Sequence, residues 1–293
     1  MFLSGDVPHV CVADLMARTA RGAGGARFVR LLRSAPTGVV VTTVDLDPTT
    51  GSPAVMGAAA DWHAIRTADA VVVTGAEPRC PNLVHEPGYR LVERIITACH
   101  GPVLFSCLAA HAALGVLYGV PRRRLSLKRC GVYRHAVAPD AGALATGLPG
   151  GLPMPHSRHN TARTADLRVV GVRPILTTMD GDWALATGTR YTFVQAHPEY
   201  EADTLLREYR RDVRRFLRGE SDVYPPLPVG CVSGERLALL AEFGRLAVRR
   251  RTPETFGWFP EPEHADQPAP WSGVAARIMA NWLTAALRVP SHT

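Results

Sequence analysis

The segment from Val103 to Leu114 constrains the fold of this chain more than any other. A short apolar run ends abruptly at Cys107, and the alanine-rich segment that follows has apolar side chains at helical spacing. This pattern predicts a strand, a tight turn that carries Cys107, and a helix. A cysteine held there projects from the carboxyl edge of a parallel sheet beside the amino end of the helix, where the backbone dipole stabilises a thiolate and free N–H groups can hold an oxyanion. The alternative is a buried core cysteine, which is the commoner case for a lone cysteine.

A candidate base follows about ninety residues later, where another short apolar strand runs into His197-Pro198-Glu199. Proline ends the strand ladder and favours an extended conformation in the residue before it, so His197 is expected at a strand end with Glu199 two residues on. The two side chains can therefore point the same way. A cysteine and a histidine, with a carboxylate that orients the second ring nitrogen, form the arrangement that maintains a thiolate nucleophile.

Strands alternate with helices through the first part of the chain. We expect strands at residues 9–14, 38–45, 70–76 and 103–106, and helical segments at residues 28–32, 62–68 and 91–99 and after Cys107. The segment 38–45 is almost continuously apolar, which is typical of a strand buried on both faces. This alternation predicts an α/β fold with a doubly wound parallel sheet that binds its ligands at the carboxyl edge, where the turn at Gly75 would lie beside Cys107.

Beyond Pro121 the pattern changes to short strands and turns. We expect strands at residues 129–137, 167–176, 183–187 and 191–196, a polar loop at 154–159, and helices at 202–218, 235–251 and 273–287. Proline- and glycine-rich segments flank the helix at 235–251, so we interpret residues 225–260 as a peripheral helical insertion. The whole chain, residues 1–293, is interpreted as a single domain.

Composition limits the class of protein. The sequence has neither a membrane-spanning apolar run nor a signal-peptide pattern, which predicts a cytoplasmic protein without a membrane partner. Its six cysteines lack the close pairs of a zinc site, so we expect reduced thiols and no metal. The net charge is +7, but aromatic residues do not interleave with the basic clusters at 122–124, 207–218 and 249–251. We therefore interpret these clusters as solvated helix faces rather than a nucleic-acid site; a basic surface also attracts phosphate-bearing molecules such as coenzyme A.

Several short motifs follow one another along most of the chain. They are Asp14-Leu15-Met16, Val73-Thr74-Gly75-Ala76, Phe105-Ser106-Cys107, Leu117-Tyr118-Gly119-Val120-Pro121, Gly131-Val132-Tyr133, Pro155-His156-Ser157-Arg158, His197-Pro198-Glu199-Tyr200, Glu208-Tyr209-Arg210-Arg211-Asp212 and Asn281-Trp282-Leu283. In order and approximate spacing, this set resembles the homoserine O-succinyltransferase and O-acetyltransferase family of the class I glutamine amidotransferase-like proteins. The resemblance implies a mostly parallel, flavodoxin-like sheet with flanking helices.

The resemblance also implies a ping-pong acyl transfer, in which a cysteine takes an acyl group from acyl-CoA and passes it to the hydroxyl of an amino acid. Cys107 would be the acylated nucleophile, His197 the general base and Glu199 its orienting partner. The N–H groups of Leu108 and of Ala76, in the loop at Gly75, are candidates for the oxyanion hole. No permanently bound cofactor is implied, since acyl-CoA is a co-substrate, and a homodimer is expected from the family alone.

Four further positions match the family's substrate site: Lys128, Ser157, Glu208 and Arg211. Arg211 corresponds to the clamp for the substrate carboxylate, a role that suits a guanidinium because it can donate two parallel hydrogen bonds. Without the resemblance, a surface salt bridge, a surface cation and a turn serine would be the better interpretation of Arg211, Lys128 and Ser157. The resemblance favours the substrate site.

Several positions depart from the family pattern. Arg79 stands at the acyl-donor specificity position, which is small in succinyl-specific members and acidic in acetyl-specific ones. A guanidinium there can pair with the free carboxylate of a succinyl group, so we favour succinyl-CoA over acetyl-CoA, although Arg79 can equally turn to a coenzyme A phosphate or to solvent. His111 replaces the family's usual glutamine, and we expect no counterpart to the amino-terminal extension of typical members. The acceptor would be homoserine, serine or a related hydroxy-amino acid.

Two other classes of function share these features. A glutamine amidohydrolase would use the same Cys-His-Glu residues on the same sheet, but it would release ammonia. A non-catalytic scaffold protein of this fold would be indifferent to Cys107→Ala, and the intact set of three catalytic residue types disfavours it.

Overall fold

A nine-stranded sheet runs through the part of the chain that the computed structural model describes, which comprises residues 7–16, 23–46, 59–232, 234–260 and 268–287. The strands are β1 (His9–Asp14), β2 (Val40–Asp45), β3 (Ala70–Val73), β4 (Val103–Ser106), β5 (Arg123–Val137), β6 (Leu152–Thr161), β7 (Arg173–Thr178), β8 (Trp183–Thr187) and β9 (Tyr191–Val194). Their order across the sheet is β2-β1-β3-β4-β9-β8-β7-β5-β6. The first five strands in this order are parallel, and the other four extend the sheet through antiparallel pairs.

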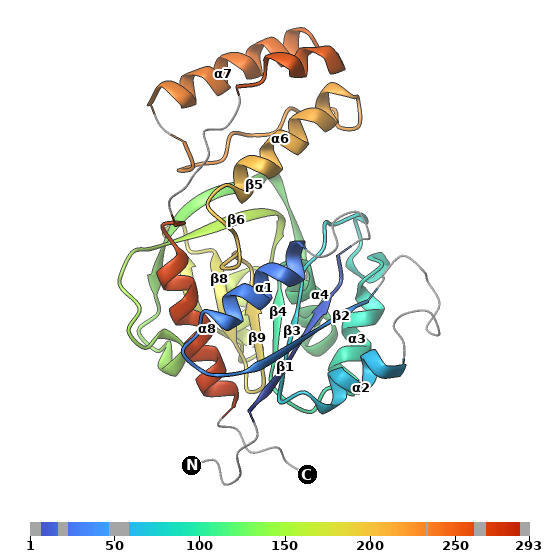
Figure 1. The fold of residues 1–293 in the computed structure, drawn as a ribbon, viewed down its shortest axis with the longest axis vertical. Helices are drawn as coiled ribbons and strands as arrows, with labels where there is room; N and C mark the ends of the chain where they lie inside the picture. Colours follow the sequence, from blue (N-terminus) through green and yellow to red (C-terminus); the bar gives the residue numbers. More distant parts are fainter. Residues whose placement is uncertain (1–6, 17–22, 47–58, 233, 261–267, 288–293) are drawn as a thin grey trace.

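Helices cover both faces of the sheet, as a doubly wound fold requires (Figure 1). They are α1 (Ala23–Arg33), α2 (Ala59–Thr67), α3 (Tyr89–Ala98), α4 (Leu108–Tyr118), α5 (Thr164–Val169), α6 (Thr204–Leu217), α7 (Gly234–Arg249) and α8 (Ser272–Ala286), with short 3₁₀ turns η2 (Leu83–His85), η3 (Gly142–Ala145) and η4 (Pro253–Trp258). Successive residues of a central strand enter opposite cores: Val71 and Val73 pack with α2, α3 and α4, while Val72 packs with α1 and α8. This two-sided burial explains why the central strands are continuously apolar.

The α/β prediction is confirmed, but one strand was placed wrongly within it. The segment at 38–45 was expected to be buried on both faces, yet β2 is the edge strand and of its residues only Val44 is buried. Apolar composition alone does not distinguish an edge strand from a central one, because the position of a strand is set by its pairing with other strands.

Two other local predictions were wrong for a related reason. Residues 154–159 are not a loop but the middle of β6, which pairs antiparallel with β5. Residues 167–176 are not one strand: α5 ends at Val169, Gly171 adopts a positive φ of 76°, and β7 begins at Arg173. Polar residues of β6, among them Ser157, His159 and Asn160, line a cavity, which accounts for the polar character of this strand.

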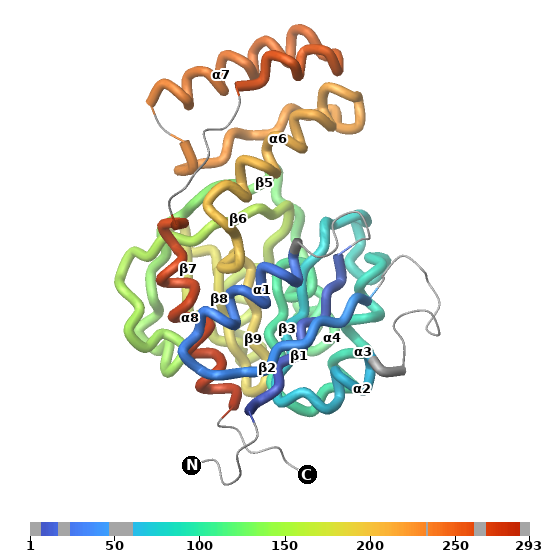
Figure 2. Tube along the Cα trace, in the orientation of Figure 1, coloured from blue at the N-terminus to red at the C-terminus, as the bar shows by residue number. Residues whose placement is uncertain are grey.

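The helices α6 and α7 form an outer layer at one end of the molecule (Figures 1 and 2). Tyr209, Val213 and Phe216 of α6 pack against Leu240 and Phe243 of α7 in a small core of their own. The interpretation of residues 225–260 as an insertion stays a prediction. Among the described residues, no helix combines the length and the apolar composition that crossing a membrane would require.

Candidate active site

Cys107 occupies a sharp turn between β4 and α4. Its φ of 49° and ψ of −115° make it the only residue other than glycine with a positive φ in the described part of the chain. The turn is held by a hydrogen bond of 2.7 Å from the Cys107 N–H to the carbonyl of Val194 in β9. Gly75 lies so close that a Cβ on it would stand 2.8 Å from the Cβ of Cys107. Such a strained backbone, kept in place by its surroundings, is typical of a nucleophile elbow.

His197 and Glu199 lie on the segment that follows β9, at the same edge of the sheet. The N–H of His197 donates to the carbonyl of Pro155 in β6 over 2.8 Å, and its Nδ1 donates to Oε1 of Glu199 over 2.8 Å. The ring of Tyr200 stacks on the imidazole, with 4.2 Å between the ring centroids. Nε2 of His197 is buried and has no hydrogen-bond partner among the described residues. The imidazole is thus fixed in orientation, and its second nitrogen remains free for proton transfer.

The charge state of His197 follows from its neighbours. Burial disfavours the charged imidazolium, but the negative charges of Glu199 and of a Cys107 thiolate outweigh it and raise the pKa of His197 well above its ordinary value. Cys107, His197 and Glu199 also border one cavity of about 640 Å³. The structure therefore brings the three predicted catalytic residues together at one cavity, beside a histidine whose pKa is raised.

The four predicted substrate-site residues line the same cavity. Ser157 donates a hydrogen bond to Oε2 of Glu208, and Nζ of Lys128 lies 3.8 Å from that oxygen. The side chain of Lys128, which is 9% exposed, forms its shorter ion pair, 2.7 Å, with Asp212. Burial opposes the charge of Lys128, but Asp212 and Glu208 overcome this and raise its pKa. Lys128 and Ser157 therefore belong to one wall of the cavity, and the alternatives of a surface cation and a turn serine do not describe them.

Arg211 lies at the edge of this wall. Its Nε and Nη2 donate to Oδ1 of Asp212 over 2.9 and 2.8 Å, and its side chain is 44% exposed. Arg211 thus makes a salt bridge and also borders the cavity. Sequence reasoning assigned no role to Asp212 or Tyr200, whose hydroxyl donates to Oε1 of Glu208 over 2.6 Å. The spacing of Glu208 and Asp212, four residues apart on one helix, is the signal that could have identified a shared acidic wall.

The oxyanion-hole candidates and Arg79 lie on the other side of Cys107. Leu108 is the first residue of α4, so its N–H has no intrahelical acceptor, and Ala76 borders the cavity. The N–H of Arg79 donates to Oε2 of Glu86 over 2.9 Å, while the Arg79 side chain is exposed at the rim of the cavity. These positions are compatible with the predicted roles, which remain predictions.

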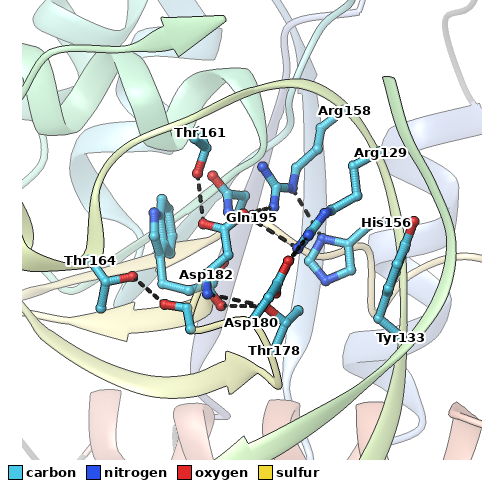
Figure 3. Close-up of polar contacts among 12 residues, drawn as sticks. Arg129, Tyr133, His156, Arg158, Thr161, Thr164, Thr178, Asp180, Asp182 and Gln195 are labelled. Carbon is cyan, nitrogen blue, oxygen red and sulfur yellow. Dashed lines mark hydrogen bonds and ion pairs between the residues drawn. The ribbon is translucent and has the colours of Figure 1, made fainter. Parts of the chain in front are cut away.

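Two buried polar groups near the cavity were missed. The basic cluster at 122–124 is not a solvated helix face: it precedes and begins β5, and Arg122, only 4% exposed, pairs with Glu86 over 2.6 Å. The second group surrounds Arg158, which donates to the carbonyl of Asn160 over 2.6 Å. Arg158 also donates to Nδ1 of His156 over 3.2 Å and to Asp182, and these three residues are labelled in Figure 3. Arg158 also borders the cavity. A single basic run in a sequence does not tell which of its members is buried.

The Arg158 contact fixes the proton of a histidine. A guanidinium can only donate, so Nδ1 of His156 accepts, and neutral His156 carries its proton on Nε2. That proton points to Nε2 of His135, 2.8 Å away. Burial lowers the pKa of His135 to about 4 and that of His156 well below its ordinary value. Both rings are therefore neutral at physiological pH, and they support the strand that carries Ser157.

Similar solved structures define the class of this fold. A glutamine amidotransferase of Methylobacillus flagellatus superposes with a TM-score of 0.56 over 98% of this chain and 99% of that protein, at 14% identity. One from Thermotoga maritima gives a TM-score of 0.53 over 96% of this chain and 99% of that protein, at 15% identity. With the sheet and the cysteine elbow described above, this likeness places the protein among the class I glutamine amidotransferase-like folds.

The family follows from sequence similarity. The profile of the family described as "HTS: Homoserine O-succinyltransferase" matches residues 9–290, so the chain belongs to that family. A homoserine O-succinyltransferase of Methylorubrum extorquens is 40% identical over 222 residues, which are 73% of this chain and 67% of that protein. The corresponding protein of Nitrosococcus oceani is 35% identical over 223 residues, 73% of this chain and 62% of that protein. The matched segment therefore spans about two thirds of these curated relatives.

Proposed function

We propose that this protein is an O-acyltransferase that moves an acyl group from acyl-CoA, through a thioester on Cys107, to the side-chain hydroxyl of homoserine or a related hydroxy-amino acid. The main support for the proposal is that two residues border the same cavity: Cys107, on a strained turn, and His197, whose ring is oriented by Glu199. Membership of the homoserine O-succinyltransferase family supports the same reaction class and favours succinyl as the acyl group. The exposed cation Arg79 at the rim suits an anionic donor.

In the first half-reaction the Cys107 thiolate attacks the thioester carbonyl of acyl-CoA. The carbonyl oxygen becomes an oxyanion, for which the N–H groups of Leu108 and Ala76 are the donors we propose. When the tetrahedral intermediate collapses, the bond to the coenzyme A sulfur breaks and that sulfur takes the proton of the His197 imidazolium. The products are free coenzyme A, an acyl thioester on Cys107 and neutral His197.

In the second half-reaction neutral His197 accepts the proton of the acceptor hydroxyl, whose oxygen attacks the Cys107 thioester. Collapse of this second intermediate releases the ester and restores the thiolate–imidazolium pair. Acylation itself prepares the base: a thioester carries no charge, so the contribution of Cys107 to the raised pKa of His197 is lost. We propose that Arg211 holds the acceptor carboxylate and that Glu208, on the same helix, holds its ammonium group.

Intact-mass spectrometry tests this proposal. The protein is incubated with succinyl-CoA or acetyl-CoA, and then with homoserine or serine. We expect a succinyl adduct on Cys107 that homoserine removes, and no adduct on Cys107→Ala. A protein that forms no acyl adduct but releases ammonia from glutamine would be an amidohydrolase, and this result would overturn the proposal.

A further inference from the structure

His111 is a buried polar residue that the proposed reaction leaves without a role. It lies on α4 four residues after Cys107, is 2% exposed, and borders the active-site cavity. Its ring stands edge-on to Trp183, with 5.9 Å between ring centroids and 71° between ring planes. Nδ1 is buried and has no hydrogen-bond partner among the described residues. Since buried polar groups are almost always hydrogen-bonded, an unpartnered one on a cavity wall indicates a ligand group.

The charge around His111 indicates which kind of ligand group it meets. Burial, together with the positive charges of Arg158 and Arg122, lowers the pKa of His111 to about 3. The imidazole is therefore neutral at physiological pH and offers one N–H donor. Both guanidinium groups already pair with carboxylates, Arg158 with Asp182 and Arg122 with Glu86, so the buried Nδ1 of His111 is left as a group that a ligand can satisfy. Asn160, also buried, adds a side-chain amide to the cavity lining.

The position of His111 relative to Cys107 suits the far end of a short acyl chain. The N–H of His111 donates to the carbonyl of Cys107 over 3.3 Å, so the two residues lie one helical turn apart, although Cys107 itself precedes α4. In a helix, side chains point back towards the amino end, so the ring of His111 extends towards the level of Cys107. The four-carbon backbone of a succinyl group covers about 4–5 Å at about 1.5 Å per bond. A succinyl group attached to Cys107 can thus bring its free carboxylate to this wall.

We propose that His111 determines acyl-donor specificity by donating a hydrogen bond to the distal carboxylate of a dicarboxylic acyl group carried on Cys107. This inference rests on the proposed acyltransferase function and names the acyl class that the site selects. His111 is better placed for discrimination than Arg79, because Arg79 is exposed and its charge is screened by water and salt. Arg79 then attracts anionic donors to the rim, and His111 distinguishes them after entry.

Two donors of equal chain length test the proposal. Succinyl-CoA and butyryl-CoA differ at the end of the acyl chain, where one has a carboxylate and the other a methyl group. The initial rate of adduct formation on Cys107 is measured with each by intact-mass spectrometry. We expect His111→Leu to lower the succinyl rate by about tenfold to a hundredfold and to leave the butyryl rate unchanged or higher, since a hydrogen bond to a charged group is lost.

Matched variants separate specificity from folding. His111→Gln keeps a neutral donor of similar reach and should retain the preference for succinyl, whereas the exposed His85→Leu should change neither rate. If His111→Leu does not fold, His111→Asn takes its place, because its shorter amide leaves the carboxylate unreached and the preference should fall.

An unchanged succinyl-to-butyryl ratio in the folded Leu or Asn variant overturns the role of His111, as does an equal loss of both rates. These results leave the acyltransferase proposal intact as long as the wild-type protein is acylated. Absence of any adduct on the wild-type protein overturns the acyltransferase proposal itself, and the role of His111 with it.

Discussion

The ion pair of Glu86 and Arg122 provides a sharp test of how the loop beside Cys107 is held. The two side chains are 2% and 4% exposed, and Glu86 Oε1 accepts from Arg122 Nη1 over 2.6 Å. Glu86 also accepts from the N–H groups of Arg79 and Cys80, and Arg122 donates to the carbonyl of Cys80 over 2.6 Å. One carboxylate and one guanidinium thus fix the loop that runs past Cys107.

Glu86→Gln keeps the shape of the side chain but removes its charge and leaves Arg122 buried without a counter-ion. Breaking a buried ion pair on one side costs about 3–5 kcal/mol. The glutamine carbonyl can still accept some of these hydrogen bonds, so we expect a loss of about 3 kcal/mol in the free energy of unfolding, measured by urea denaturation. Acylation of Cys107 should slow as well, because the loop carries Ala76 and Arg79.

A neighbouring ion pair provides the control. Glu93 pairs with Arg90 over 2.7 Å, but the side chains are 43% and 74% exposed, and Glu93→Gln should leave stability unchanged within error. Adding Arg122→Met to the Glu86→Gln variant should restore part of the lost stability, because the uncompensated charge is gone. If Glu86→Gln and Glu93→Gln lower the free energy of unfolding by the same small amount, burial does not make the Glu86–Arg122 pair important for stability, and our reasoning is wrong.

Three further predictions concern charge. The pKa of His197, followed by NMR of its ring protons, should be lower in the succinylated protein than in the free protein, because acylation removes a charge that raises it; equal pKa values would contradict this. Burial lowers the pKa of His135 to about 4, so between about pH 6.5 and pH 4 the unfolded chain binds a proton there that the folded protein does not. The free energy of unfolding should therefore decrease as the pH drops below about 6.5. Urea denaturation of the protein and of His135→Gln should show the wild type losing about 2 kcal/mol more between about pH 7.5 and pH 5, and equal losses would refute it. Arg79→Glu should slow labelling by succinyl-CoA at low salt but not at high salt, since the charge is exposed; a salt-independent effect would argue against steering.

The positions of the three candidate catalytic residues could be predicted because each has a local signal. A short apolar run that stops at Cys107 before a helical pattern, and a strand that stops at His197 before a proline, both place a side chain at the carboxyl edge of a parallel sheet. Neighbouring parallel strands then bring these edges together, and β4 and β9 do pair directly. Here local pattern and sheet topology agree, so little else is needed to find the site.

The walls of the cavity were less predictable because they depend on pairing between distant segments. The segment around Ser157 looks like a polar loop until β5 pairs with it. Arg122 resembles any other arginine of a basic run until Glu86, 36 residues away, is placed against it. Propensity and periodicity describe neighbours in sequence, whereas the burial of a charge depends on a partner from another element.

Three arginine residues near the cavity form ion pairs with carboxylates, so their charges are offset locally. Arg122 is paired with Glu86, Arg158 with Asp182, and Arg215 with Glu77 over 2.6 Å. The side chains of Arg122 and Arg158 are almost fully buried in their pairs, so these two guanidinium groups are held in place. The charges of Cys107 and His197 are different, because they change during the proposed reaction. In the proposed reaction, therefore, the charged groups of the walls stay paired while the charge at the centre of the site changes with each half-reaction.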